Sequence, residues 1–532
     1  MPIDCISYQK SGFFSKLIVD YLDEKSVIIP FYNRFPKIEN FKDQIEEKGF
    51  NYNCNDNKKR QILVSELEKQ YSNFEISDAT KNNIKLLTNS NTFTITTGHQ
   101  LNLFTGPLYF IYKIVTTINL CKQLKKEYPK QNFVPIYWMA TEDHDFEEIN
   151  YFNFKNEKIQ WQNESLGPVG RLSTKGLKNV LLEFSSEVGG SENATYLIDL
   201  FEKSYLDHSN LADATRFLAN ELFKEEGLVI LDGDSIALKK LFIPYIKEEL
   251  LHQTSFKKVS ETSDKLSDYK IQVNPREINL FYIENTLRER IILENGIYKV
   301  NNTSITFTES EIFLELENHP EKFSPNVILR PLYQEVILPN LCYIGGGGEL
   351  AYWLELKSNF DANKVTFPIL LLRNSAVTIT YKQKEKINKL ELSYADLFTY
   401  QQELLDKKTK EFSKFSVDFT EQKKALKKQF EALFEIASQT DKSFTGAVKA
   451  QEIKQIRGLE NLEKRLLRAE KRIYNDRLMR ILALQNEIFP NQSLQERRAN
   501  FSEFYLEFGN DFLNKILSEL KPLDQEFKII TL

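Results

Sequence analysis

The sequence predicts an α/β fold built around a βαβ unit and followed by a long helical hairpin. Two apolar, strand-like runs, 93–96 and 133–140, each end in polar, titratable residues, and one helix-sized segment separates them. Buried parallel strands have this pattern, and in α/β folds the chemistry gathers at their carboxyl ends. After about Tyr381, helix-forming residues dominate and apolar residues fall three and four apart, which is typical of amphipathic helices.

The composition indicates a globular chain and excludes several classes of partner. Its 532 residues suffice for roughly three or four domain-sized units. A net charge of -5 gives no basic surplus, so nucleic acid is not expected as a partner. No apolar run approaches the roughly 20 residues that span a bilayer, so we expect a cytoplasmic protein without a membrane partner. The four cysteines, Cys5, Cys54, Cys121 and Cys342, show no CxxC spacing. The sequence therefore predicts neither a disulfide framework nor a zinc site.

The first apolar run predicts a phosphate-binding site. Residues up to about Ser90 form a lead-in with helical spacing, after which 93–96 breaks into a polar tetrapeptide. Gly98 allows a sharp turn, and 103–107 opens a helix whose free N–H groups attract an anion. His99 beside a triphosphate could stabilise charge on the leaving phosphate, although it could also simply cap a helix. The phosphate-binding residues predicted here are Thr97, Gly98, His99, Gln100 and Gly106.

The second run ends in four titratable residues, 142–145. Packing acids together perturbs their pKa values and is costly unless a positive group lies among them. A solvated turn with His144 as a cap is the plainer alternative. A metal site ranks lower because no second His or Cys stands at ligand spacing, although Mg²⁺ arriving with a nucleotide needs few protein ligands. We predict catalytic roles for His99, Asp143 and His144, substrate-binding roles for Glu142 and Asp145, and no resident metal.

Two insertions and further core strands follow. The stretch 151–215 is polar and glycine-punctuated, which suggests a surface insertion, and 245–321 resembles a small β-containing subdomain. After Tyr343-Ile344, the run Gly345 to Gly348 could form a nest of N–H groups around an anion, with Gly346 and Gly347 as ligands; a tolerant glycine turn is equally consistent. Glu349 could hold an amine or a ribose hydroxyl. Arg330 and Arg373 each end an apolar run, where charge usually faces a site.

The spacing of apolar residues over 385–505 predicts an antiparallel coiled-coil hairpin whose two helices are joined at 438–446. Residues 506–532 are expected to form a tail. The excess of apolar residues predicts that a second copy covers the hairpin, which makes it a dimerisation domain of a homodimer. The predicted seam consists of Leu426, Phe430, Leu433 and Ala437 on one helix and Leu459, Leu462, Leu466, Ala469 and Ile473 on the other, resuming out of register at Leu478. The surplus includes Phe434, Ile456, Leu467 and Leu478.

Five motifs follow one another along the chain: Thr97-Gly98-His99-Gln100 with Phe104-Thr105-Gly106-Pro107, Glu142-Asp143-His144-Asp145, Ser324-Pro325-Asn326 with Leu329-Arg330-Pro331, Gly345 to Gly348 with Glu349 and Tyr352-Trp353, and Leu372-Arg373-Asn374-Ser375. Taken in order, they resemble the BshC family of cysteine-adding enzymes in bacillithiol biosynthesis. The resemblance covers essentially the whole chain. It implies a Rossmann-like core over 1–384 similar to that of class I aminoacyl-tRNA synthetases, interrupted by two connecting-peptide insertions, and a coiled coil that pairs subunits.

The resemblance also implies a reaction in which the carboxyl group of L-cysteine is joined to the amine of glucosaminyl malate. Amide formation needs an activated acyl group, so we expect ATP as the co-substrate. Arg330 and Arg373 would hold the malate carboxylates, and Glu349 and Trp353 would also contact substrate. No Lys-Met-Ser-Lys-Ser-like loop follows 372–375, so a cysteinyl-adenylate mechanism stays open. Two alternatives are a nucleotidyltransferase with another acceptor and a coiled-coil scaffold with a vestigial nucleotide site.

Overall fold

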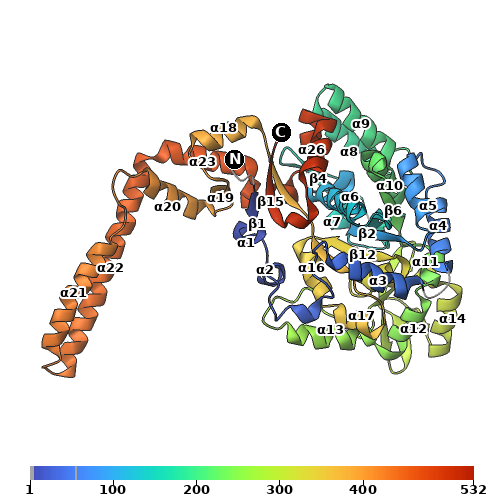
Figure 1. Ribbon diagram of the computed structural model, residues 1–532, viewed down its shortest axis with the longest axis horizontal. Coiled ribbons are helices and arrows are strands. Elements are labelled where there is room, and N and C mark those ends of the chain that lie inside the picture. Colours follow the sequence, from blue (N-terminus) through green and yellow to red (C-terminus); the bar gives the residue numbers. More distant parts are fainter. Residues whose placement is uncertain (1–4, 54–56, 164) are drawn as a thin grey trace. The chain divides into compact units, whose positions relative to one another are not determined.

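The structure is a computed structural model that describes residues 5–53, 57–163 and 165–532 (Figure 1). The chain forms two compact units. The core unit comprises the residues up to 378 together with 495–530, and the helical unit comprises 379–494. Cys54 lies outside the described residues. In the described part of the chain, no helix is both long enough and apolar enough to cross a membrane.

The core unit is organised around a five-stranded parallel sheet with the strand order β13-β12-β2-β3-β6. The chain builds outward from β2 through β3 to β6, then returns to the other side of β2 with β12. This reversal between β2 and β12 is the switch point at which Rossmann folds bind ligands. The predicted βαβ unit is confirmed, because α6 (Tyr109–Glu127) connects β2 to β3. The strands are β2 (Thr92–His99), β3 (Asn132–Met139), β6 (Val229–Asp232), β12 (Asn340–Gly345) and β13 (Ile369–Leu372).

Strand β2 is longer than the sequence pattern indicated. It continues through Gly98 and His99, which pair with Trp138 and Met139 of β3. Gly98 therefore does not make the predicted turn. A Cβ there would lie 3.1 Å from the Tyr343 hydroxyl, so the glycine permits close packing. The chain turns afterwards, at the 3₁₀ segment Leu103–Thr105.

The lead-in is helical, as predicted, and covers the sheet. Phe41 of α3 packs in one apolar cluster with Phe93 of β2 and Leu341 of β12. Cys121 and Cys342 belong to the same cluster, and burial raises the pKa of both thiols, so both are unreactive core residues. The larger lead-in helices are α2 (Lys16–Leu22), α3 (Asn40–Asn53), α4 (Lys58–Gln70) and α5 (Asp78–Leu86).

The two insertions differ in character. The stretch 151–215 has an aromatic interior in which Phe104 contacts Phe152, Phe184 and Phe201, so it is not the purely polar surface that its composition suggested. The second insertion is the expected β-containing subdomain, with strand order β10-β9-β8-β7-β11. Elements of the first are β4 (Tyr151–Phe154), β5 (Glu157–Gln160), α8 (Leu177–Val188) and α9 (Glu192–Tyr205). The second sheet comprises β7 (Leu280–Glu284), β8 (Leu287–Glu294), β9 (Ile297–Val300), β10 (Thr306–Phe307) and β11 (Phe323–Pro325).

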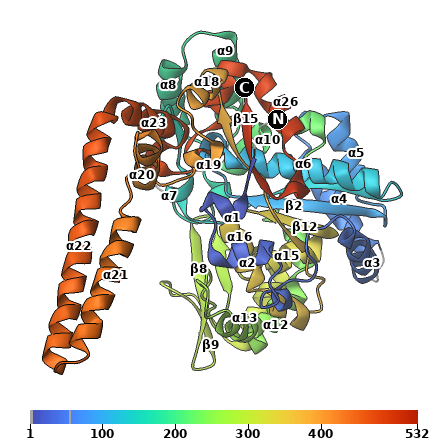
Figure 2. The same cartoon turned by 60° about the vertical axis from the view of Figure 1, so that its left-hand side comes forward.

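The helical unit contains the predicted hairpin, formed by α21 (Thr420–Ala437) and α22 (Lys442–Ile473) (Figure 2). The link is shorter than predicted, because Asp441 accepts a hydrogen bond from the N–H of Phe444 and caps α22. The predicted seam is partly wrong, since Leu433, Leu462 and Ile473 are 44%, 51% and 70% exposed. Leu478, predicted to belong to the exposed surplus, is instead buried. The observed seam contains Phe430, Ala437 and Val448, with Leu426 and Phe434 against them. Helices flanking the hairpin are α18 (Tyr381–Lys389), α20 (Gln401–Phe412) and α23 (Asn475–Ile488).

The C-terminal segment returns to the core unit and is not a tail. Strand β15 (Glu526–Thr531) lies between β1 (Cys5–Ser7) and β14 (Ser375–Ile379). Both partners of this strand are more than a hundred residues away in sequence, so local patterns do not reveal the pairing. The helices that precede it are α24 (Gln495–Arg498), α25 (Phe501–Phe508) and α26 (Asn510–Glu519).

Candidate functional site

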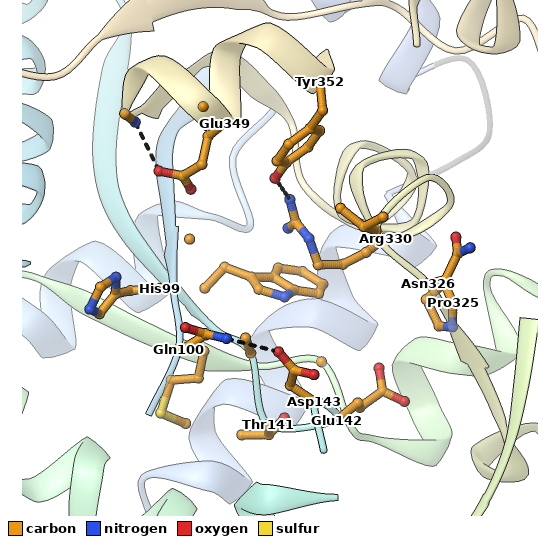
Figure 3. A pocket seen from close by; sticks show the side chains of 18 of the residues that line it. His99, Gln100, Thr141, Glu142, Asp143, Pro325, Asn326, Arg330, Glu349 and Tyr352 are labelled. Carbon is orange, nitrogen blue, oxygen red and sulfur yellow. Dashed lines mark hydrogen bonds between the residues drawn. The ribbon is translucent and has the colours of Figure 1, made fainter. Parts of the chain in front are cut away.

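A cavity of about 770 Å³ opens at the carboxyl ends of β2, β3 and β12, where the Rossmann switch point lies (Figure 3). The second insertion closes the other side through β8 and the segment before β7. Ten of the predicted site residues line this cavity: Gly98, His99, Gln100, Glu142, Asp143, Arg330, Gly346, Gly347, Glu349 and Arg373. The sequence therefore predicted much of one site, although its strand ends are far apart along the chain.

Five predicted site residues lie elsewhere. The hydroxyl of Thr97 donates to the carbonyl of Ile344 inside the sheet. Trp353 is fully buried against Tyr343, so it supports the site from the core. Gly106 lines a smaller adjoining cavity of about 340 Å³. His144 and Asp145 are exposed residues outside the cavity lining.

His99 is an uncharged donor or acceptor at this site. It is 8% exposed and packs against Tyr109 and Phe110. Burial, together with the charges of Lys113 and Arg373, lowers its pKa well below the ordinary value, so the imidazole is neutral at neutral pH. Its Nε2 has no hydrogen-bond partner among the described residues. The ring can therefore offer a hydrogen bond to a ligand but carries no charge for it.

Lys113 is a positive group beside the end of β2, and the sequence interpretation missed it. It is a buried residue of α6 whose Nζ donates to the Gly98 carbonyl at 2.7 Å and lies 2.6 Å from Glu349 Oε2. Burial lowers its pKa, and the carboxylate of Glu349 counteracts this. A lone lysine within the apolar run 110–118 of a helix was the available signal.

Glu349 is already occupied by protein partners. Besides the ion pair with Lys113, its Oε2 accepts the N–H of Gly346 at 2.8 Å and so caps α16 (Gly347–Leu354). Burial alone would raise its pKa, but the attraction of Lys113 and these hydrogen bonds lower it. The carboxylate therefore orients Lys113 and the glycine run through Oε2, and its predicted contact with substrate stays a prediction.

Several donors surround the start of α16. The Arg373 guanidinium is fixed by Glu496 at 2.7 Å and by the carbonyl of Asn374 at 2.9 Å, while its buried Nε has no hydrogen-bond partner in the described part of the chain. A Cβ added to Gly346 would lie 3.8 Å from this Nε, so the first glycines of α16 lie beside the guanidinium. Together with the His99 ring, these groups form a donor set suited to an anion.

Glu142 and Asp143 are stabilised by different cations. Glu142 pairs with buried Lys239, although burial still raises its pKa. Burial would also raise the pKa of Asp143, but hydrogen bonds from His144 and Gln100 and the charge of Arg288 together lower it. Asp143 Oδ2 accepts from Gln100 Nε2 at 3.1 Å (Figure 3). Asp143 is therefore ionised at neutral pH, which makes it a poor proton acceptor and a good partner for an ammonium group.

The cavity is strongly cationic, because the second insertion adds arginines that the sequence interpretation missed. Arg288 stacks on Phe281 and donates to His144 Nδ1 at 2.6 Å, whereas Arg276 and Arg290 have no ion-pair partner among the described residues. The cations lining the cavity are Lys113, Arg276, Arg288, Arg290, Arg330, Arg373 and Arg497, and its carboxylates are Glu142, Asp143 and Glu349. This surplus favours ligands with several negative charges. No group of three His, Cys, Asp or Glu side chains suited to a metal was found in the described ranges.

Two family models match the chain in succession. "Bacillithiol biosynthesis BshC, N-terminal Rossmann-like domain" matches residues 1–374, and "Bacillithiol biosynthesis BshC, C-terminal coiled-coil domain" matches 376–532. A protein of Flavobacterium psychrophilum named "Putative cysteine ligase BshC" is 67% identical over 530 residues, which cover 100% of this chain and 99% of that relative. A relative of the same name from Bacillus cereus is 27% identical over the full length of both chains. A solved "putative arginyl t-RNA synthetase" from Campylobacter jejuni aligns with 83% of this chain and 95% of its own, at 12% identity and a TM-score of 0.21, too low to support an argument.

Proposed function

Because this chain belongs to the BshC family of bacillithiol biosynthesis, we propose that it is a ligase that joins the carboxyl group of L-cysteine to the amine of glucosaminyl malate and consumes ATP. The observation that carries the proposal is the cationic cavity at the switch point, in which seven cations face three carboxylates. Both the phosphates of a nucleotide and the carboxylates of a malyl group need such surroundings.

The donor set around α16 supports ATP as the co-substrate. A free carboxylate does not form an amide at useful rates, and a nucleotide supplies the activation. The unpaired Nε of Arg373, a buried donor, fits a phosphate-bearing ligand, and the unpaired Nε2 of His99 fits it in the tautomer that carries the proton there, because neither atom has a protein partner among the described residues. Lys113 adds positive charge beside them, where negative charge would develop on a leaving phosphate.

The arginines of the second insertion support a site for the malyl carboxylates. Arg330 and Arg373 were predicted for this role, but Arg330 binds Gln334 and Tyr352, and Arg373 is held by Glu496. Arg276 and Arg290 line the same cavity with no ion pair in the described part of the chain, so they are the better candidates. Asp143 would then hold the ammonium of cysteine or of the acceptor. A cytoplasmic location, where both substrates and ATP are available, is part of this proposal.

Reconstitution tests the proposal against its alternatives. Purified protein given ATP, L-cysteine and glucosaminyl malate should form the cysteinylated thiol, detected by mass spectrometry, and a deletion strain should accumulate glucosaminyl malate and lack that thiol. Release of pyrophosphate without cysteine would favour a nucleotidyltransferase with another acceptor. Normal thiol in the deletion strain, together with no nucleotide binding, would favour a scaffold.

The hairpin is part of the proposal as a homodimer contact. Six apolar side chains of the described α21 and α22 are between 42% and 70% exposed: Leu433, Ile436, Phe444, Ile453, Leu462 and Ile473. Apolar surface of this kind on one hairpin is usually covered by a partner, and a second copy is the simplest one.

We expect the full chain to sediment as a dimer at micromolar concentration, and Ile436→Glu with Leu462→Glu to convert it to a monomer, because both side chains are solvent-accessible within one chain. Lys424→Glu on the same hairpin is the control and should leave the dimer intact. Cutting the chain near Tyr381 is not a clean test, since it would also remove the core residues 495–530. A parent chain that is monomeric would refute this contact.

A further inference from the structure

One irregular segment supplies two residues to the cavity. Residues 270–276 have no helix or strand, yet Asn274 and Arg276 line the cavity. The segment follows α13 (Thr254–Lys265) and precedes β7. A loop that carries binding residues must be fixed by contacts outside the site, because its own backbone makes few hydrogen bonds.

The segment is held at both ends by buried polar side chains. Glu355, directly after α16, accepts the N–H of Gln272 on Oε1 at 2.8 Å and the N–H of Val273 on Oε2 at 3.4 Å. At the other end, Asn279 accepts the N–H of Arg276 at 3.1 Å and donates to its carbonyl at 2.8 Å. Glu355 is 0% exposed and has no ion pair with a basic side chain among the described residues. Burying an unpaired carboxylate is costly, so its position requires an explanation.

We propose that Glu355 is a positioning residue whose carboxyl group fixes segment 270–276, so that Arg276 and Asn274 face the cavity and hold the carboxylates of the acceptor. The role given to the acceptor rests on the proposed function, whereas the fixing of the segment does not. Helix α16 begins at the donor set around Gly346 and ends at Glu355. One helix thus supports the two halves of the cavity.

The charge state of Glu355 gives this role a pH signature. Burial raises the pKa of Glu355, and the hydrogen bonds from the two N–H groups lower it by less. The net result is a pKa of about 7. If segment 270–276 detaches from Glu355, water reaches the carboxyl group and its pKa returns toward the ordinary 4.5. Glu355 therefore binds a proton more tightly when the segment is attached than when it is detached. Attachment is therefore strongest at low pH and weakens as the pH rises to about 7. With a pKa of about 7, lowering the pH from 8 to 6 should increase the protection of segment 270–276 against amide hydrogen exchange about tenfold.

Other titratable groups surround Glu355, and most have partners of their own. The helix α2 packs on α16 and carries Asp20, which pairs with Lys25, and Lys16, which lies over the Tyr269 ring. Burial of Asp20 would raise its pKa, but its bonds to Lys25 and Tyr269 lower it, so it stays ionised in this pH range. The remaining titratable groups on α16, the neighbouring strands and the segment are Glu349, Tyr352, Cys342, Tyr343, Lys270 and Arg276.

Amide hydrogen exchange of the full chain tests the fixing directly. We expect Glu355→Leu, which removes both acceptors, to speed exchange in 270–276 at least tenfold while β12 is unchanged. Glu355→Gln mimics the protonated acid, so it should keep the segment protected and abolish the tenfold change that the parent shows between pH 6 and pH 8, after correction for intrinsic exchange. Glu503 is the matched control, because burial raises its pKa to about 7 as well and it does not line the cavity.

Activity provides the second readout. Glu355→Leu should raise KM for the acceptor at least tenfold with kcat changed less than threefold, and Glu503→Leu should leave KM unchanged. Unaltered exchange in 270–276, or equal acceleration in β12, would overturn the positioning role. If the Leu variant does not fold, a parent segment whose protection is independent of pH would overturn it instead. Absence of ligation by the parent would refute the proposed function, while the exchange result would still decide the role of Glu355.

Discussion

Replacing Asp143 by asparagine is expected to lower kcat/KM for cysteine ligation at least hundredfold. Asp143 is ionised and lines the cavity at the end of β3, held by Gln100 Nε2 at 3.1 Å and by the N–H of His144 at 2.8 Å. Asparagine keeps the shape of the side chain but removes the negative charge that would hold an ammonium group. It also replaces one of the two accepting oxygens, to which Gln100 and His144 donate, with an NH₂ group. A hundredfold loss corresponds to about 2.7 kcal/mol of transition-state stabilisation, the size expected for a charge-assisted contact.

Asp145→Asn is the matched control, because Asp145 is an exposed carboxylate two residues away that does not line the cavity. Its kcat/KM should stay within about threefold of the parent. Steady-state thiol formation measures both variants, and their melting temperatures should agree with that of the parent. Equal activity of the two variants would remove Asp143 from the site. His99→Ala is a less clean experiment, since that ring is buried between Tyr109 and Phe110 and its loss would open a space in the core.

The sequence predicted the strand ends of the site because each rests on a local pattern. An apolar run followed by titratable residues was sufficient to place His99, Asp143 and the glycines after Tyr343 at one edge of a sheet. It could not assign partners, however. The sequence alone shows Glu349 as an unpaired carboxylate, and only the structure shows that Lys113 of α6 neutralises it.

The missed arginines differ in how visible they were. Arg288 and Arg290 alternate with Glu289 on β8, and alternation on a strand places both arginines on one face, so the signal was present. Arg276 lies in an irregular segment with no periodicity, and nothing nearby in sequence indicates that Glu355 holds it. The return of residues 495–530 to the core was equally hidden, because its contacts join segments more than a hundred residues apart.

That return leads to the largest expected loss of stability. Arg373 and Glu496 form a buried ion pair with side chains 6% and 1% exposed and 2.7 Å between Nη2 and Oε1. Glu496 also accepts from the Ser375 hydroxyl and the N–H of Ala376, each at 3.2 Å. Glu496→Ala leaves a buried guanidinium without its counter-charge, and such losses cost about 3–5 kcal/mol. We expect the urea midpoint of the core unit to fall accordingly.

Tryptophan fluorescence reports this unit alone, because the chain's 3 tryptophans, Trp138, Trp161 and Trp353, all lie in it. Glu519→Ala is the control, since its pair with Lys515 is at the surface and should contribute less than about 1 kcal/mol. A midpoint shift no larger than that of the control would show that the return of 495–530 does not depend on this pair.

Replacing both partners by apolar residues separates stability from function. Arg373→Met with Glu496→Leu removes two buried charges together, and apolar replacement of a buried pair is often neutral, so part of the lost stability should return. The rest stays lost because the N–H of Ala376 no longer has Glu496 as its acceptor. Ligation should not return with it, because the unpaired Nε of Arg373 at the start of α16 would be gone. A double variant that is both stable and fully active would mean that Arg373 serves only to hold the C-terminal segment. A stable, inactive one would place its guanidinium in the anion site.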